Sequence, residues 1–173
     1  MERAVLHHFS EDASIGEFVP HVPATNPDHR PAIWAIDTEH APLYWFPRDC
    51  PRVTVWPRPS DDANVFKTAW NTTARRVHVT ELGWLDRIRS STIYRYDLPA
   101  EWFEPWPEAS GQWIAETTVS PLDVTPIPDL LQAHVTAGIE LRFAPSLWAA
   151  RDVAVSDRWD FSIVRMANAE PRP

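Results

Sequence analysis

The shortage of glycine is the feature that most restricts what this chain can fold into. Its 173 residues include only four glycines, and these lie far apart in the sequence, at Gly16, Gly83, Gly111 and Gly138. Phosphate-binding loops, dinucleotide-binding fingerprints, nucleophile elbows and kinase glycine loops all need glycines a few residues apart. The sequence therefore excludes these sites. A phosphate site in this chain must be built from side chains or from turns without glycine.

Length and charge narrow the class of protein further. A chain of this size is long enough for one buried core, so we expect a single domain over residues 1–173, with loose ends at 1–3 and 169–173. The net charge is −8, with Lys67 as the single lysine, and this charge argues against a nucleic-acid partner. The chain has no apolar run of about 18 residues and no signal-peptide core at its start, which predicts a cytoplasmic protein without a membrane partner.

The pattern of short apolar and β-branched runs predicts the fold class. Strands are expected at 4–9, 32–36, 52–56, 76–80, 92–98, 112–119, 139–143 and 161–166. Helices are expected at 61–70, 82–88, 129–137 and 146–155, with a further short one within 38–46. No regular alternation of strand and helix appears, so we predict an α+β domain with a mostly antiparallel sheet.

Histidines concentrate near the start of the chain, where five of the seven lie within the first 40 residues. His7 and His8 are neighbours in the first predicted strand and point to opposite faces, so at most one of them can serve a given pocket. Three histidines and a carboxylate, namely His8, His21, His29 and Asp28, are the chemically possible ligands of a metal-dependent hydrolase. Their spacing matches no metal motif, and we predict no metal site.

A segment bounded by prolines carries the only cysteine. Arg48 and Arg52 flank Cys50, and each could lower the pKa of its thiol or hold an anion through two parallel hydrogen bonds. The alternatives are that Cys50 is a small buried apolar residue and that both arginines are surface charges. One cysteine also excludes an intrachain disulfide.

Glu116 falls within the strand predicted at 112–119. Ionisable residues are depleted in strands unless they are exposed or functional. Glu116 is therefore either a solvent-facing glutamate or a catalytic carboxylate.

Several motifs resemble a small bacterial family of about this length and of unknown function. The opening His8-Phe9-Ser10 is followed by Ile33-Trp34-Ala35-Ile36-Asp37 and by the segment from Phe46 to Arg52. Similar stretches continue at Arg87-Ile88-Arg89-Ser90 and Pro145-Ser146-Leu147-Trp148. The resemblance covers nearly the whole chain, and it brings no established activity.

A wider resemblance connects residues 4–127 to the ADP-ribosyltransferase-like fold, which is built from mostly antiparallel split sheets with short helices. His8-Phe9-Ser10 is similar to the first motif of that group, Trp34 with residues 37–46 to the second, and the strand ending at Glu116 to the third. The resemblance implies that NAD is the cofactor. It implies that His8 and Ser10 hold the ribose and amide, that Trp34 stacks on the nicotinamide, and that Glu116 stabilises an oxocarbenium-like state.

This chain departs from the group's pattern at three positions. Phe9 replaces a small residue, Trp34 replaces a tyrosine or histidine, and Ile114 stands where a second glutamate would be. These departures argue against arginine-directed ADP-ribosylation. Arg48 and Arg52 are the candidates to hold the phosphates of NAD or of another nucleotide.

A second hypothesis is a binding module without catalysis. It would take a small molecule or a peptide in a cleft rich in tryptophan. The cleft would be lined by Trp34, Trp45, Trp56 and Trp113.

Overall fold

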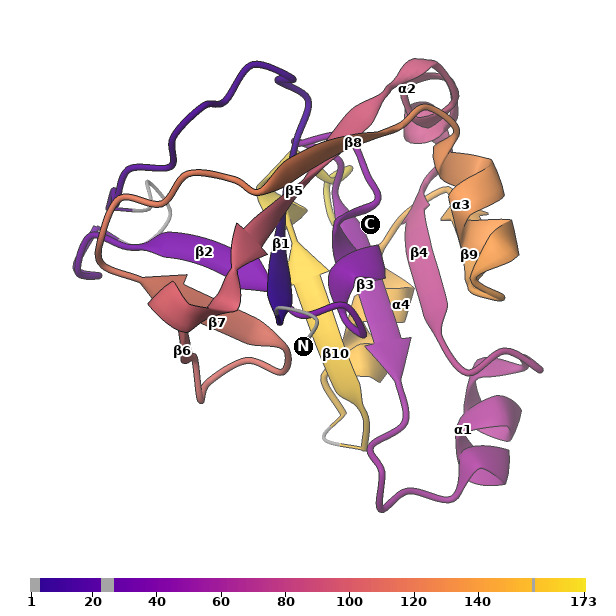
Figure 1. Ribbon diagram of the computed structural model, residues 1–173. Helices are drawn as coiled ribbons and strands as arrows, with labels where there is room; N and C mark the ends of the chain where they lie inside the picture. The colour runs from indigo at the N-terminus through magenta and orange to yellow at the C-terminus, as the bar shows by residue number, and fades with distance from the viewer. Residues whose placement is uncertain (1–3, 23–26, 157) are drawn as a thin grey trace. The chain divides into compact units, whose positions relative to one another are not determined.

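The computed structural model describes residues 4–22, 27–156 and 158–173, and it divides into two compact units. The first unit combines residues 1–44 with 93–127, and the second combines residues 45–92 with 128–173. Each unit has its own sheet (Figure 1). The α+β class and the two mostly antiparallel sheets agree with the prediction.

A six-stranded antiparallel sheet forms the first unit, in the order β6-β7-β2-β1-β5-β8. Its strands are β1 (Val5–Ser10), β2 (Ile33–Ile36), β5 (Ile93–Pro99), β6 (Glu104–Pro105), β7 (Gln112–Ala115) and β8 (Asp123–Ile127). Two 3-10 turns, η1 (Ala41–Tyr44) and η3 (Ala100–Trp102), complete the unit. Pro126 is compatible with β8 because that strand lies at the edge of the sheet, where a missing N–H is tolerated.

The two faces of this sheet differ in chemistry. Residues that oppose each other across antiparallel strands share a face, and successive residues alternate between the faces. One face carries the apolar core of Leu6, Phe18, Ile33, Ala35, Tyr96, Leu98, Phe103, Ala115 and Val119. His7 opposes both Ile36 and Asp97, and Ile36 opposes Gln112, so these residues project from the other face, which we call the polar face.

A four-stranded mixed sheet forms the second unit, in the order β10-β3-β4-β9. Its strands are β3 (Arg52–Trp56), β4 (Val77–Glu81), β9 (Glu140–Ala144) and β10 (Asp160–Val164), and β4 and β9 are parallel. Its helices are α1 (Ala63–Trp70), α2 (Leu85–Ser90), α3 (Leu130–Thr136) and α4 (Trp148–Ala154), with 3-10 turns η2 (Leu82–Trp84) and η4 (Met166–Asn168).

Both faces of the inner strands of this second sheet are buried, but only one face is apolar. Val53, Val55, Val77 and Val79 pack with Phe66, Trp70, Leu147, Ala154 and Trp159. The alternate residues Arg52, Thr54, His78 and Thr80 are polar and equally buried. Arg52 opposes Thr80, and Thr54 opposes His78, so the four polar side chains form one continuous group.

Local capping explains where two of the helices begin and end. The Asp62 carboxylate accepts the N–H of Asn64 at 2.8 Å at the start of α1, and Asn71 ends that helix in the left-handed region. Asp129 accepts the N–H of Gln132 at 2.9 Å and starts α3, and Gly138 follows that helix at φ 66°. These two helices lie within the ranges that the sequence predicts.

Two expectations differ from the structure. The short helix expected within 38–46 is present as a 3-10 helix, at Ala41–Tyr44, and not as an α-helix. The strand expected at 112–119 ends at Ala115, where its pairing with Ile33 of β2 also ends. In the C-terminal segment, where a loose end is expected at 169–173, the Glu170 N–H donates to the Glu81 carboxylate and the Glu170 carbonyl accepts Trp148 Nε1–H at 2.9 Å. The loose start expected at 1–3 lies outside the described residues.

Candidate functional site

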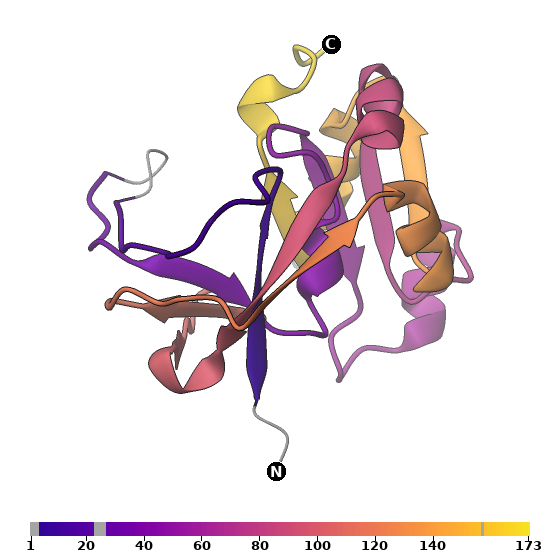
Figure 2. The ribbon, with the colours of Figure 1, turned by 45° about the horizontal axis from the view of Figure 1, so that its top comes forward.

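A small cavity opens in the first unit where β1 and β2 separate. The two strands share a single registered pair, His7 with Ile36, and they diverge beyond it (Figure 2). The cavity has a volume of about 80 Å³. Its lining consists of His7, His8, Phe9, Trp34, Ala35, Ile36, Tyr44 and Gln112. The expectation that at most one of His7 and His8 serves a given pocket is therefore wrong, because the cavity lies where the pairing of β1 with β2 ends and is lined by residues of both faces of β1.

Two of the predicted NAD-binding residues, His8 and Trp34, both line this cavity, although the register gives their side chains to different faces of the sheet: His8 opposes Tyr96 of the apolar face, and Trp34 shares the polar face with Ile36. His8 Nδ1 lies 2.8 Å from the Trp34 carbonyl oxygen, which can only accept, so Nδ1 carries the proton. This bond joins β1 to β2 where their ladder has ended. The His8 ring also packs against Phe18, with 4.8 Å between the ring centroids. His8 therefore has a fixed orientation at the cavity.

Two further aromatic rings and an amide belong to the lining of the cavity. The rings of Phe9 and Tyr44 are within 5° of parallel, and their centroids lie 6.3 Å apart. The Gln112 amide donates to the Tyr44 hydroxyl at 2.8 Å. The cavity thus offers flat apolar ring surfaces beside oriented polar groups, which is the usual make-up of a small-molecule site.

Trp34 belongs to a cluster of three rings with His29 and Trp106. His29 and Trp106 each pack against the Trp34 ring, with centroids 5.1 Å and 5.5 Å away. Within the described part of the chain, Trp34 Nε1 and His29 Nε2 are both buried without a hydrogen-bond partner. His29 Nδ1 lies 2.6 Å from the Arg30 carbonyl, so Nε2 is an acceptor, whereas Trp34 Nε1–H is a donor.

Ser10 and Glu116, the other two residues expected around NAD in this unit, do not line the cavity. Ser10 lies at the end of β1, where its hydroxyl accepts the Asp12 N–H at 3.1 Å. Glu116 lies just beyond β7, exposed, in an ion pair with Arg30. The catalytic role of Glu116 stays a prediction.

The proposed phosphate-binding arginines belong to the second unit. Arg48 is exposed, whereas Arg52 is 3% exposed, donates to the Cys50 carbonyl at 3.0 Å and packs over the Phe46 ring. Cys50 is fully buried, and burial raises the pKa of its thiol to about 11 even though Arg52 opposes the shift. Cys50 is thus the small buried residue of the two alternatives and is not an activated nucleophile.

One group of polar residues escaped the sequence analysis. His7 Nδ1 lies 2.8 Å from Asp97 Oδ1, and His7 Nε2 lies 2.9 Å from Thr38 Oγ1. Asp97 and Thr38 are 90 and 31 residues away from His7 in the chain. The alternation of β1 separates His7 from His8, but no sequence pattern identifies these partners.

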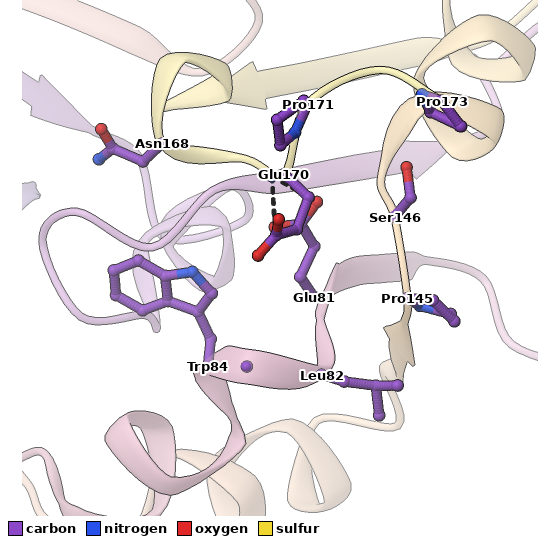
Figure 3. Close-up of a pocket in the computed structure, with 10 residues that line it drawn as sticks. Glu81, Leu82, Trp84, Pro145, Ser146, Asn168, Glu170, Pro171 and Pro173 are labelled. Carbon is purple, nitrogen blue, oxygen red and sulfur yellow. Dashed lines mark hydrogen bonds between the residues drawn. The ribbon is translucent and has the colours of Figure 1, made fainter.

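A larger cavity, of about 610 Å³, lies in the second unit (Figure 3). Trp84, Ser146, Asn168 and several prolines line it. Its buried carboxylate, Glu81, points at the C-terminal segment, where it accepts the N–H of Glu170. Glu81 also accepts the Leu147 N–H at 3.2 Å, so its oxygens hold the backbone and are not presented to a ligand.

Two of the four tryptophans expected to line one cleft, Trp34 and Trp113, lie on opposite faces of the same sheet. Ala35 opposes Trp113, so Trp113 lies on the apolar face of the first sheet, and Trp34 lies on the polar face. Trp45 and Trp56 belong to the second unit.

Among the described residues, no three histidine, cysteine, aspartate or glutamate side chains are grouped so that they could hold a metal ion. Nor does the described part contain a helix long and apolar enough to cross a membrane.

Comparison with known proteins identifies one family. Residues 7–169 match the model of a family of unknown function, DUF6886. No curated protein and no solved structure gives a significant match. The match confirms the expected membership in a family of unknown function, and it provides no link to the ADP-ribosyltransferase-like proteins.

Proposed function

We propose that this protein, which belongs to the DUF6886 family, binds a small molecule through the cavity between β1 and β2. The group bound is a single planar heteroaromatic ring, and the nicotinamide ring of NAD is the first candidate. One observation carries the proposal. His8 and Trp34, which the sequence predicts as NAD-binding residues, line the same cavity with Phe9, Tyr44 and Gln112.

The chemistry of the lining suits a flat ring with a polar substituent. Aromatic side chains bind other rings through stacked or edge-to-face contacts. The Gln112 amide and the Tyr44 hydroxyl can exchange hydrogen bonds with a carboxamide or a ring nitrogen. Because Trp34 is held by His29 and Trp106, little side-chain entropy is lost when a ring packs on it.

The size of the cavity limits how much of a ligand enters it. Sites that enclose a whole drug-sized ligand measure about 300–1,000 Å³. A cavity of about 80 Å³ therefore takes one ring, and the rest of a dinucleotide lies outside it. It follows that nicotinamide alone competes with NAD for the site.

Binding is tested by calorimetry or ligand-observed NMR with NAD and with nicotinamide. His8→Asn is the matched variant, because the Asn amide can still donate to the Trp34 carbonyl while the imidazole ring is lost. Trp113→Phe, which does not line the cavity, is the control. We expect His8→Asn to weaken binding at least about tenfold, which corresponds to about 1.4 kcal/mol, and Trp113→Phe to bind as the wild type does. Absence of binding by either ligand at millimolar concentration would overturn the proposal.

A transferase and a binding module differ in what happens after binding. In a transferase, Glu116 breaks its exposed ion pair with Arg30 and stabilises positive charge on the ribose. Release of nicotinamide from NAD then depends on Glu116, and Glu116→Gln abolishes release while binding persists. Binding of NAD without release of nicotinamide identifies the binding module.

A further inference from the structure

A chain of hydrogen bonds on the polar face of the first sheet joins a hydroxyl, an imidazole and a carboxylate. Thr38 Oγ1 lies 2.9 Å from His7 Nε2, and His7 Nδ1 lies 2.8 Å from Asp97 Oδ1. The connectivity is that of a nucleophile, a general base and an orienting carboxylate. All three residues belong to the first unit.

The protons in this chain have a defined direction. Asp97 as a carboxylate only accepts, so His7 carries its proton on Nδ1. Neutral His7 then presents the lone pair of Nε2, and the Thr38 hydroxyl donates to it. Arg95 holds Asp97 from the other side, with Nε 2.8 Å from Oδ1 and Nη2 3.1 Å from Oδ2. This two-point contact holds the carboxylate in its orientation toward His7.

The solvent exposure of the three side chains suits nucleophilic catalysis, in which the nucleophile is accessible and its base is shielded. His7 is 4% exposed, whereas Thr38 is exposed at the surface. The turn that carries Thr38 is fixed by Asp37, whose carboxylate accepts the N–H of His40 at 2.8 Å and whose own N–H donates to Gly111. His7 also lines the β1–β2 cavity. A substrate can therefore reach the hydroxyl while the base stays shielded from water.

We propose that Thr38 is a nucleophile that accepts an acyl group from a carboxylic ester, with His7 as its general base. Thr38 Oγ1 bonds to the acyl carbon, and its proton moves to His7 Nε2. The ester C–O bond breaks, and the leaving alkoxide takes that proton. Water then attacks the acyl-Thr38 and gives one proton to His7, which passes it to the departing Thr38 oxygen. The sum is ester plus water giving acid plus alcohol.

Asp97 is a positioning residue in this scheme, because it acts through His7 and does not touch the substrate. It selects the tautomer that leaves Nε2 free to take a proton, and it stabilises the imidazolium that forms. The proposal does not depend on ring binding, so failure of NAD to bind leaves it unaffected.

The test uses p-nitrophenyl acetate with the full chain. We expect a burst of p-nitrophenolate and one acetyl group located by peptide mass spectrometry on Thr38. Background acetylation is small, because Lys67 is the single lysine. Thr38→Val keeps the shape of the side chain and should slow acylation by at least about 100-fold, whereas Thr38→Ser should retain it. Thr118→Val, at another exposed threonine of the same unit, is the matched control and should react as the wild type does.

Variants at Asp97 separate catalysis from a purely structural hydrogen bond. Asp97→Asn should cost several orders of magnitude in acylation, and Asp97→Glu should restore part of it, with the melting temperatures of the two variants compared directly. A structural role alone predicts lower stability in both and no acetyl on Thr38 in the wild type. No burst from the wild type, or Thr38→Val reacting as fast as the wild type, would overturn the proposal.

Discussion

His78 Nδ1 of β4 lies 3.0 Å from His134 Nε2 of α3, in the interior of the second unit. His134 Nδ1 lies 2.7 Å from the Leu130 carbonyl, so it carries a proton and Nε2 is an acceptor. His78 must then donate through Nδ1, and both imidazoles are neutral. Within the described residues, His78 Nε2 is left buried without a partner.

This pair makes stability depend on pH. Burial lowers the pKa of His78 well below its ordinary value of 6.5, and it lowers that of His134 below 6.5 too. In the unfolded chain both histidines take up protons as the pH falls through about 6.5, whereas in the folded chain they stay neutral to a lower pH. The unfolded state therefore binds more protons, and the free energy of unfolding falls as the pH falls.

Above pH 7 we expect the titration of this pair to have no effect on the free energy of unfolding. Below about pH 6.5 the free energy of unfolding should fall by up to about 1.4 kcal/mol per pH unit for each histidine. Urea unfolding at pH 7.5 and pH 5.5 measures the loss. The control is the double variant His78→Phe/His134→Leu, which removes both titrating groups and should flatten the dependence between these two values. An equal loss of stability in the double variant would assign the effect to other groups.

Cys50 should be inert in the native protein. Burial raises the pKa of its thiol to about 11, and its sulfur lies 3.2 Å from Thr80 Oγ1. Since Thr80 donates to the Pro51 carbonyl, the thiol must supply the proton of the Cys50–Thr80 bond. We expect no reaction with Ellman's reagent at pH 8 without denaturant and complete reaction in urea, with Cys50→Ser as the blank. Rapid native reaction would contradict the buried, protonated state.

Gly111 should be required for the turn that carries Thr38. Its φ is +74°, and a Cβ on this residue would lie 2.4 Å from Cγ and Nδ1 of His40. Gly111→Ala should therefore cost about 1–3 kcal/mol and displace His40 from Asp37, as judged by urea unfolding and by the NMR signals of His40. Gly16→Ala is the matched control, since nothing lies within 4 Å of its Cβ. Equal effects of the two substitutions would contradict this account.

Local patterns were sufficient to predict the elements that depend on local chemistry. The β-branched run Arg52–Trp56 forms β3, and Asp129 and Gly138 bracket the helix expected between them. The strand expected to reach Val119 ends at Ala115, because strand length is set by the partner strand, and β2 extends only from Ile33 to Ile36. Propensity within one segment contains no information about a partner 80 residues away.

In the candidate site, too, some residues could be predicted from local sequence and others could not. His8 and Trp34 were predicted as a pair, and they line one cavity. The partners of His7 were not predictable, because Thr38 and Asp97 reach it through chain pairing, and Asp97 does so through the register of β1 on β5. The sequence singles out Glu116 both as a carboxylate inside a predicted strand and through the resemblance to the ADP-ribosyltransferase-like fold. The strand ends before Glu116, so its exposure needs no functional explanation.

Glu81 should hold the C-terminal segment against the second unit. Its carboxylate is 3% exposed and accepts the Leu147 N–H at 3.2 Å and the Glu170 N–H at 3.0 and 3.1 Å. Hydrogen bonds to a charged group contribute about 1.5–3 kcal/mol each, so Glu81→Ala should lower stability by about 2–3 kcal/mol or more and speed hydrogen exchange at the Glu170 amide. Glu170→Gln is the control, because the backbone of Glu170, and not its exposed side chain, makes the contact. If Glu81→Ala left exchange at Glu170 unchanged, another contact, such as Trp148 Nε1 on the Glu170 carbonyl, would have to hold the segment.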